Sequence, residues 1–177
     1  TGRLPERPIG ELLQAMRAHG VRFSAEQLPF KIEGTLMGGA FELPGNISSQ
    51  YLTGLLLALP LLEQESRILL TTPLESAAYV DITLHALRRF GVTVPVRKGE
   101  YRISGGQRYR SPGMLRVDGD WSNASFFLAA GALSAPVTVS GLNLASPQGD
   151  KAMLDALMAF GAKVEASTDS VCVSPAP

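Results

Sequence analysis

The sequence predicts a mixed α/β protein of the α+β type, built from repeated units. Helix-like segments end at a glycine three times, at Gly20, Gly91 and Gly161, which are 71 and 70 residues apart. Short alternating runs typical of strands follow each of these helices. A period of about 70 residues is too long for a solenoid and is typical of supersecondary units that share a core. We expect two full copies of a helix–strand–helix–strand–strand unit, preceded by the back half of an earlier copy.

Length and composition limit the classes of function. The chain has 177 residues, of which 45% are hydrophobic and 18% charged, enough for one ordinary domain or two small ones with real cores. Its 16 basic and 16 acidic side chains balance. That balance argues against a dedicated nucleic-acid or polyanion binder, but it leaves room for a local anion site.

Metal, disulfide and membrane roles have little support in the sequence. The single cysteine, Cys172, lies in the alternating run SVCVS and is expected to be a small core residue. His19 and His85 lack HxxH or HExxH spacing, so no metal site is expected. The apolar run 51–62 is too short to span a membrane, and the first residues lack a signal-peptide pattern. We expect a soluble, cytoplasmic protein.

The first part of the chain predicts a helix followed by short strands. Residues 1–8 are expected to form a loop, or the cut end of something longer, and Pro8 suits the first turn of a helix. That helix is expected at 9–19, and Gly20 follows in the position that favours a left-handed residue. Strands separated by glycine and proline are expected at 21–23, 30–33 and 39–43.

The first full copy opens with the apolar run 51–62, which predicts a helix buried on most of its sides. A strand at 66–71 and a loop lead to a helix at 78–89, whose apolar side carries Val80, Leu84 and Leu87. Three more strands are expected, at 93–97, 101–104 and 114–117.

The second copy repeats this plan after a turn at 118–120. Its expected elements are a helix, a strand, a second helix and a closing hairpin, at 126–133, 136–140, 151–160 and 163–173. The helix starts also match, since Gly45 precedes Ser48 by the same three residues that separate Gly119 from Ser122.

The stretch with the most chemical content is GNISSQ, residues 45–50, at the start of the helix predicted over 51–62. The first turn of a helix carries unpaired backbone N–H groups and the positive end of the helix dipole, which favour an anion. Ser48 and Ser49 can cap those groups or direct hydroxyl donors at a phosphate, and Gln50 adds an amide. Taken alone, the stretch is compatible with ordinary N-capping and with anion binding.

Five longer stretches resemble the enolpyruvyl transferases, in order and over nearly the whole chain. They are ERPIG at 6–10, GNISSQYLTGLLLALPL at 45–61, ESAAYVDITLHALRRFGV at 75–92, SPGMLRVDGDWSNASFFLAAGAL at 111–133 and QGDKAMLDALMAFGA at 148–162. The pairing of SSQ with a later S-x-x-Y-x-D-x-T is specific to the branch that acts on shikimate-3-phosphate. The sister enzyme acting on UDP-N-acetylglucosamine shares the unit but not this pairing. The resemblance implies the family's inside-out α/β barrel of βαβαββ units, with about two and a half units present.

The resemblance also implies a reaction and its binding residues. The reaction is transfer of the enolpyruvyl group of phosphoenolpyruvate to the 5-hydroxyl of shikimate-3-phosphate, with release of phosphate and no cofactor. By resemblance, Ser48, Ser49, Gln50, Ser76 and Tyr79 bind shikimate-3-phosphate, and Gln50 also reaches phosphoenolpyruvate. Hydroxyls, an amide and helix-start N–H groups can bind a dianionic phosphate without a metal.

The family's catalytic groups are expected outside this chain. Its members are longer and close two lobes, each of three units, on the substrates. By resemblance, residues 1–117 belong to one lobe as two units, the first incomplete, and 118–177 are the first unit of the other lobe. The chain departs from many members at 77–78, where Ala-Ala replaces Lys-Pro. No catalytic residue is therefore expected within these residues.

Three carboxylates are candidates for a replacement proton shuttle: Asp81, Asp120 and Asp150. Asp81 and Asp150 fall at or near predicted helix starts, where N-terminal capping is the expected role. Four arginines are expected on solvated faces rather than as phosphate clamps: Arg88, Arg89, Arg108 and Arg110.

We expect the isolated chain to be an inactive fragment of an enzyme that is monomeric at full length. Two alternatives stay open: a non-catalytic module that binds a phosphorylated cyclitol or another anion, and a structural fragment that self-associates.

Overall fold

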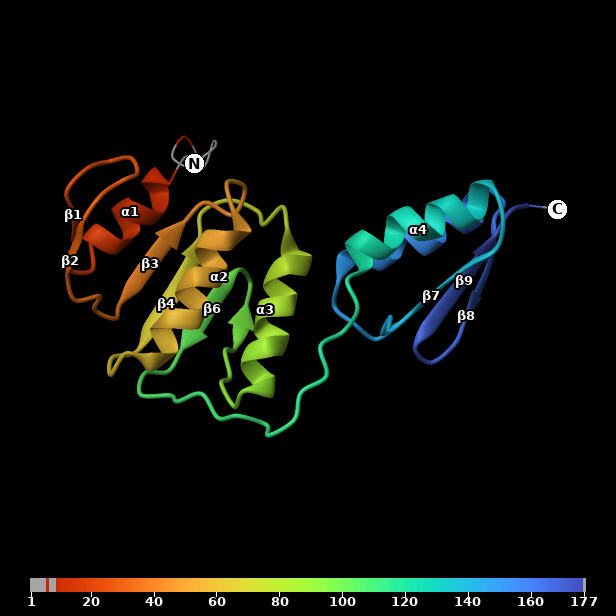
Figure 1. The fold of residues 1–177 in the computed structure, drawn as a ribbon. Helices are drawn as coiled ribbons and strands as arrows, with labels where there is room; N and C mark the ends of the chain where they lie inside the picture. Colours follow the sequence, from red (N-terminus) through yellow and green to blue (C-terminus); the bar gives the residue numbers. More distant parts are fainter. Residues whose placement is uncertain (1–5, 7–8, 177) are drawn as a thin grey trace. The chain divides into compact units, whose positions relative to one another are not determined.

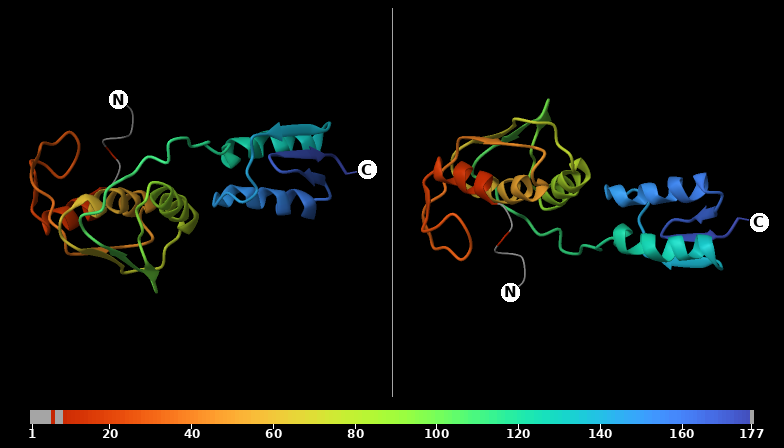
Figure 2. Two further views of the ribbon diagram at one scale, coloured as in Figure 1. Left: turned by 90° about the horizontal axis from the view of Figure 1, so that it is seen from below. Right: turned by 90° about the horizontal axis from the view of Figure 1, so that it is seen from above.

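The computed structural model describes residue 6 and residues 9–176 (Figures 1 and 2). Contacts within the chain divide it into two compact units, Thr1–Pro112 and Gly113–Pro177. Apart from Glu6, the loop expected at 1–8 and its Pro8 lie outside the described residues. Within the described part, no helix is long and apolar enough to cross a membrane.

Helices and short strands alternate in the first unit, mostly where the sequence predicts them. The elements are α1 (Gly10–Arg17), β1 (Val21–Phe23), β2 (Ile32–Gly34), β3 (Ala40–Leu43), α2 (Ser49–Ala58), the 3-10 turn η2 (Leu59–Leu61), β4 (Ser66–Leu70), α3 (Ala77–Arg89), β5 (Val96–Arg97) and β6 (Glu100–Ile103). Gly20 follows α1 with φ +94°, a conformation that a side chain would strain. The predicted left-handed glycine is confirmed, and the regular helix ends at Arg17, two residues before the predicted end at 19.

Four strands of the first unit form one sheet in the order β3-β4-β6-β5. β3 runs parallel to β4, and β6 is antiparallel to both of its neighbours. A parallel pair needs a crossover, which α2 supplies. The helices α2 and α3 lie side by side on one face of the sheet (Figures 1 and 2). The opposite face carries the exposed side chains of Glu42, Arg67 and Arg102.

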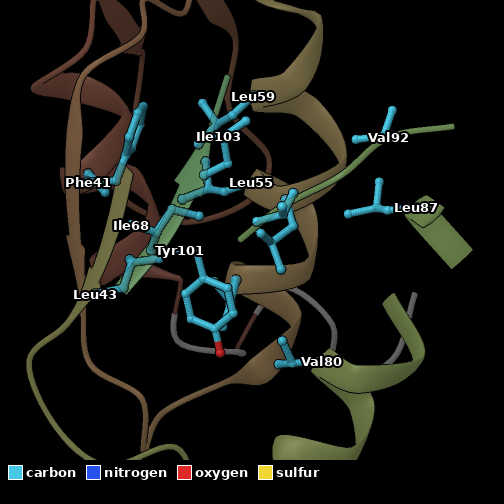
Figure 3. Close-up of a cluster of buried hydrophobic side chains, with 14 residues drawn as sticks. Phe41, Leu43, Leu55, Leu59, Ile68, Val80, Leu87, Val92, Tyr101 and Ile103 are labelled. Atoms are coloured by element: carbon cyan, nitrogen blue, oxygen red, sulfur yellow. The ribbon is translucent and has the colours of Figure 1, made fainter. Parts of the chain in front are cut away.

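The core of the first unit lies between this sheet and the two helices (Figure 3). Phe41, Ile68 and Ile103 alternate with the exposed strand residues and are at most 1% exposed. Leu55 and Leu56 of α2 meet them and are at most 3% exposed. Burying each such side chain is worth about 1.5–3 kcal/mol, so this contact fixes both helices on the sheet.

The predicted burial of the run 51–62 is confirmed for most of its residues, but one outer face is open. Leu57 of α2 and Leu61 of η2 are 44% and 52% exposed. The helix begins at Ser49, two residues before the predicted start, because Ser48 caps it. Regular helix stops at Ala58, since Pro60 has no N–H to continue the ladder, and η2 follows.

Three antiparallel strands and two helices make up the second unit. Its elements are α4 (Trp121–Leu133), β7 (Val137–Ser140), the 3-10 turn η3 (Gly149–Ala152), α5 (Met153–Ala159), β8 (Lys163–Ala166) and β9 (Ser170–Ser174). The strand order is β7-β9-β8. Trp121 is fully buried against Val171 and Val173, and its indole N–H donates to the Asn143 carbonyl at 3.2 Å.

The topology agrees with the predicted repeat. In the first unit β6 lies between β4 and β5, and in the second β9 lies between β7 and β8. The last strand of each copy thus takes the central position. Before them, α1 and the antiparallel pair β1–β2 supply the back half of an earlier copy.

Two strand predictions need correction. Residues 114–117 form no strand, and Met114 and Val117 are 90% and 83% exposed. An alternating run becomes a strand only where a neighbouring backbone pairs with it, and in the described residues none does. The strand predicted at 93–97 is only two residues long, since Pro95 offers no N–H to a ladder.

Two predictions in the second unit are also wrong. The helix α4 begins at Trp121, five residues before the predicted start, because the Asp120 carboxylate caps it. Cys172 is half-buried and alternates with the fully buried Val171 and Val173. It therefore faces away from the core, on the other side of β9.

Candidate functional site

A pocket of about 520 Å³ lies in the first unit, at the amino-terminal ends of α2 and α3. Its lining comes from the two residues before α2, from Ser76 before α3, and from the first two turns of both helices. The lining residues are Ile47, Ser48, Ser49, Gln50, Thr53, Ser76, Tyr79, Ile82 and Thr83. All five residues singled out in the sequence are among them, although 26 residues separate Gln50 from Ser76. Folding therefore brings the predicted set to one place.

The loop before α2 is shaped by Thr72, which the sequence did not single out. The Thr72 hydroxyl accepts from the backbone N–H of Gly45 at 2.9 Å and of Asn46 at 3.2 Å, and it donates to the Asn46 side chain at 2.9 Å. Gly45 has no room for a side chain, since a Cβ there would lie 2.6 Å from the Thr72 carbonyl oxygen. This close approach holds the start of α2 against the end of β4.

Few side chains cap the first backbone N–H groups of α2 and α3. Ser48 has the extended backbone of an N-cap, and its hydroxyl accepts from the Gln50 N–H at 3.3 Å, a long hydrogen bond. Ser76 stands at the N-cap of α3, and its side chain makes no capping bond. Neither first turn contains an acidic residue. Two partly positive helix ends therefore border one pocket, with hydroxyls between them.

The helix α4, which takes the place of α2 in the second copy, has a different cap at its amino-terminal end. The Asp120 carboxylate accepts from the backbone N–H of Ser122 at 2.8 Å and of Asn123 at 3.2 Å, and from the Asn123 amide at 2.7 Å. The N-cap is thus Asp120 rather than Ser122, whatever the matching spacing in the sequence. A resident carboxylate already neutralises this helix end.

The expected capping roles of Asp81 and Asp150 are wrong. Ser76 and Gln148 occupy the N-caps of the two helical segments in question, without a side-chain cap. Asp81 lies five residues into α3 and is exposed, and Asp150 lies inside η3. Asp120 caps because its backbone is extended and its carboxylate reaches back over the first turn. The four arginines expected on solvated faces are exposed: Arg88, Arg89, Arg108 and Arg110.

A pair of threonine hydroxyls joins the two helices in the wall of the pocket. Thr53 Oγ1 of α2 lies 2.9 Å from Thr83 Oγ1 of α3, and the Thr83 hydroxyl donates to the Tyr79 carbonyl at 3.0 Å. Thr83 is 7% exposed. No sequence signal singles out either threonine, although both lie within the stretches 45–61 and 75–92 that resemble the family.

The pocket has no formal charge in its lining. Its polar groups are hydroxyls, one amide and backbone N–H groups, and none of its nine lining residues is a lysine, arginine, histidine or carboxylate. Within this lining, attraction for an anion comes from the helix ends and from neutral hydrogen-bond donors. Within the described residues, no three His, Cys, Asp or Glu side chains gather where they could hold a metal ion.

A larger hollow of about 630 Å³ lies elsewhere in the first unit, along strands β3, β4 and β6. Charged residues of both signs line it, and Glu100 accepts from Arg102 at 3.1 and 3.3 Å. It has no helix start in its lining. The smaller pocket is the better candidate because several donors converge in it.

Comparison with known proteins gives the family. Residues 2–177 match the family model described as EPSP synthase (3-phosphoshikimate 1-carboxyvinyltransferase). The chain belongs to this family. A 3-phosphoshikimate 1-carboxyvinyltransferase of Clostridium perfringens (strain ATCC 13124) is 42% identical over 166 residues, 92% of this chain and 39% of that protein. One of Yersinia pestis bv. Antiqua (strain Angola) is 42% identical over 175 residues, 96% of this chain and 41% of that protein.

Solved structures share the EPSP synthase fold seen here. An EPSP synthase from Acinetobacter baumannii aligns with a TM-score of 0.74 at 21% identity, over 98% of this chain and 41% of that one. The enolpyruvyl transferase NikO from Streptomyces tendae aligns with a TM-score of 0.72 at 18% identity, over 95% and 42%. The predicted fold of the enolpyruvyl transferases is confirmed. The chain spans about two fifths of the length of these relatives.

Proposed function

We propose that this chain is part of a 3-phosphoshikimate 1-carboxyvinyltransferase and that its pocket binds shikimate-3-phosphate. The whole enzyme transfers the enolpyruvyl group of phosphoenolpyruvate to the 5-hydroxyl, releases phosphate, and works as a cytoplasmic monomer without a cofactor. One observation carries the proposal. The motif residues Ser48, Ser49, Gln50, Ser76 and Tyr79 converge on two helix ends that lack a carboxylate.

The phosphate of the substrate takes the place over the first turn of α2. Its oxygens accept from backbone N–H groups there and from the hydroxyls of Ser48 and Ser49, while Ser76 and Tyr79 approach from α3. The long Ser48 cap bond, 3.3 Å, is readily exchanged for one to a dianion. Gln50 is exposed at the rim, and we assign it a second contact with phosphoenolpyruvate.

We assign residues 1–117 and 118–177 to different lobes of the whole enzyme. The division by contacts within the chain falls five residues earlier, after Pro112. The isolated chain binds but does not turn over, because the pocket lining contains no side chain that exchanges a proton near neutral pH. The acid, the base and the cations that complete the site are assigned to the rest of the protein.

A phosphorus NMR titration with shikimate-3-phosphate tests the proposal. We expect the chain to bind the ligand at millimolar concentration and the variant Ser48→Ala/Ser49→Ala to bind at least tenfold more weakly, because two donors to a charged group are lost. Ser122→Ala is the matched control, since that serine follows the helix end occupied by Asp120. Equal binding by the double variant would refute the assignment. Phosphate release on adding phosphoenolpyruvate would refute the absence of turnover.

A second candidate role, self-association, rests on exposed apolar side chains of the second unit. Phe126, Phe127, Leu133 and Phe160 are between 62% and 90% exposed, which is unusual for large apolar groups that have no partner. An elution volume in size exclusion that changes on dilution would support this role.

The third possibility, a general anion module, predicts that inorganic phosphate binds as tightly as shikimate-3-phosphate.

A further inference from the structure

The direction of donation between Thr53 and Thr83 follows from a second hydrogen bond of Thr83. A hydroxyl carries a single proton, and a carbonyl oxygen can only accept. The Thr83 hydroxyl donates to the Tyr79 carbonyl at 3.0 Å. The 2.9 Å contact between the two threonines can be a hydrogen bond at the same time only if Thr53 is its donor.

This direction leaves Thr53 as an acceptor toward the pocket. Thr83 is 7% exposed and helps line the pocket, and Thr53 is half-buried in the same wall. With its proton directed to Thr83, the Thr53 oxygen presents only lone pairs to a ligand. An anion would be repelled there, whereas an alcohol O–H would be bound.

We infer that Thr53 binds an alcohol group of the ligand, at a point separate from the anion position at the helix starts. The inference rests on the proposed function and deepens it. Four residues of α2 separate Ser49 from Thr53, a rise of about 6 Å, and side chains four apart share a helix face. The pocket thus selects an anion that carries a hydroxyl about one helical turn away, as a phosphorylated cyclic polyol does, over a simple anion.

Thr83 acts as a positioning residue in this arrangement. It keeps the proton of Thr53 turned away from the ligand, because its oxygen accepts that proton at 2.9 Å. Without the Thr83 hydroxyl, the Thr53 proton can rotate toward the pocket and compete with the incoming alcohol. The two helices would still pack through their apolar residues Leu52, Leu56, Val80 and Leu87, all buried.

The test compares two probes on the 177-residue chain, shikimate-3-phosphate and inorganic phosphate, by phosphorus NMR titration. Thr53→Val removes the acceptor with little change of shape. We expect it to weaken shikimate-3-phosphate binding about five- to tenfold, as loss of one hydrogen bond predicts, and to leave the affinity for inorganic phosphate unchanged. Thr53→Ser restores the acceptor and the affinity. Thr83→Val is expected to weaken the same probe selectively, and Thr83→Ser to bind it like wild type.

The results of this test distinguish a failure of the proposed function from a failure of this inference alone. If the wild-type chain binds neither probe at millimolar concentration, the proposed function fails and the inference fails with it. If the wild-type chain binds shikimate-3-phosphate and Thr53→Val binds it equally well, only the inference is refuted. Parallel losses for both probes would also refute it, because a general change of the pocket then explains the effect. Should Thr53→Val not fold, Thr53→Ala, which favours helix, gives the same comparison.

Discussion

Thr72→Val tests whether one hydroxyl holds the loop that shapes the pocket. The change deletes three hydrogen bonds, two accepted from the N–H groups of Gly45 and Asn46 and one donated to the Asn46 side chain. At about 0.5–1.5 kcal/mol each, the upper limit for the three bonds is about 4.5 kcal/mol. Asn46 is exposed, so hydrogen bonds to water replace part of the lost energy. We expect the free energy of unfolding of the first unit to fall by about 2 kcal/mol.

The neighbouring Thr71→Val is the matched control. Thr71 is exposed and is held by a backbone bond from its N–H to Leu43, so its free energy of unfolding should change by no more than about 0.5 kcal/mol. Urea unfolding followed by far-ultraviolet circular dichroism measures both. Trp121 is the single tryptophan and belongs to the second unit, so its fluorescence transition should stay in place. If Thr72→Val unfolds like Thr71→Val, the loop does not depend on this hydroxyl.

Two further changes test the helix end of the second copy and the core of the first. Asp120→Ala removes an N-cap and should lower the stability of the second unit by about 1 kcal/mol, read from Trp121 fluorescence in urea; Asp120→Asn should retain most of it, and equal losses in both would contradict a capping role. Burial, and secondarily the charge of Asp81, raises the pKa of Tyr101 above its ordinary 10.0. The pKa of Tyr101 is higher in the folded than in the unfolded chain. Its contribution to the free energy of unfolding is therefore fully present below pH about 10 and is lost as pH rises through the folded pKa. Tyr101→Phe should therefore reduce the alkaline fall in melting temperature, and an unchanged slope would contradict this assignment.

The type and order of most elements could be predicted because they depend on local signals. Gly20, Gly91 and Gly161 all take positive φ, at 94°, 79° and 94°, as expected of residues that end helices. The strand predicted at 114–117 failed for the opposite reason. Its alternation is local, but a strand requires a partner backbone that local sequence does not specify.

The polar contacts behind the pocket could not be predicted in the same way. Thr72 acts on residues 26 and 27 positions earlier, and Thr53 and Thr83 are 30 positions apart. Each pair meets only because β3 and β4 align in parallel and α2 packs beside α3. The local sequence around a threonine in a helix or loop does not show which distant residue its hydroxyl will contact. The motif serines could be singled out because a helix start is a local feature with a known affinity for anions, and because the stretch resembles a family motif.

The two copies of the repeat show why only one of these helix ends is available to a ligand. Both helices start where the chain enters from a glycine, and both need acceptors for their first N–H groups. In the second copy the Asp120 carboxylate meets two of these groups at 2.8 and 3.2 Å, so a ligand anion would face a fixed negative charge. In the first copy a neutral Ser48 makes one bond of 3.3 Å. The weaker cap leaves the first N–H groups of α2 less well satisfied by its own chain, and this is the physical basis of the phosphate binding that we propose there.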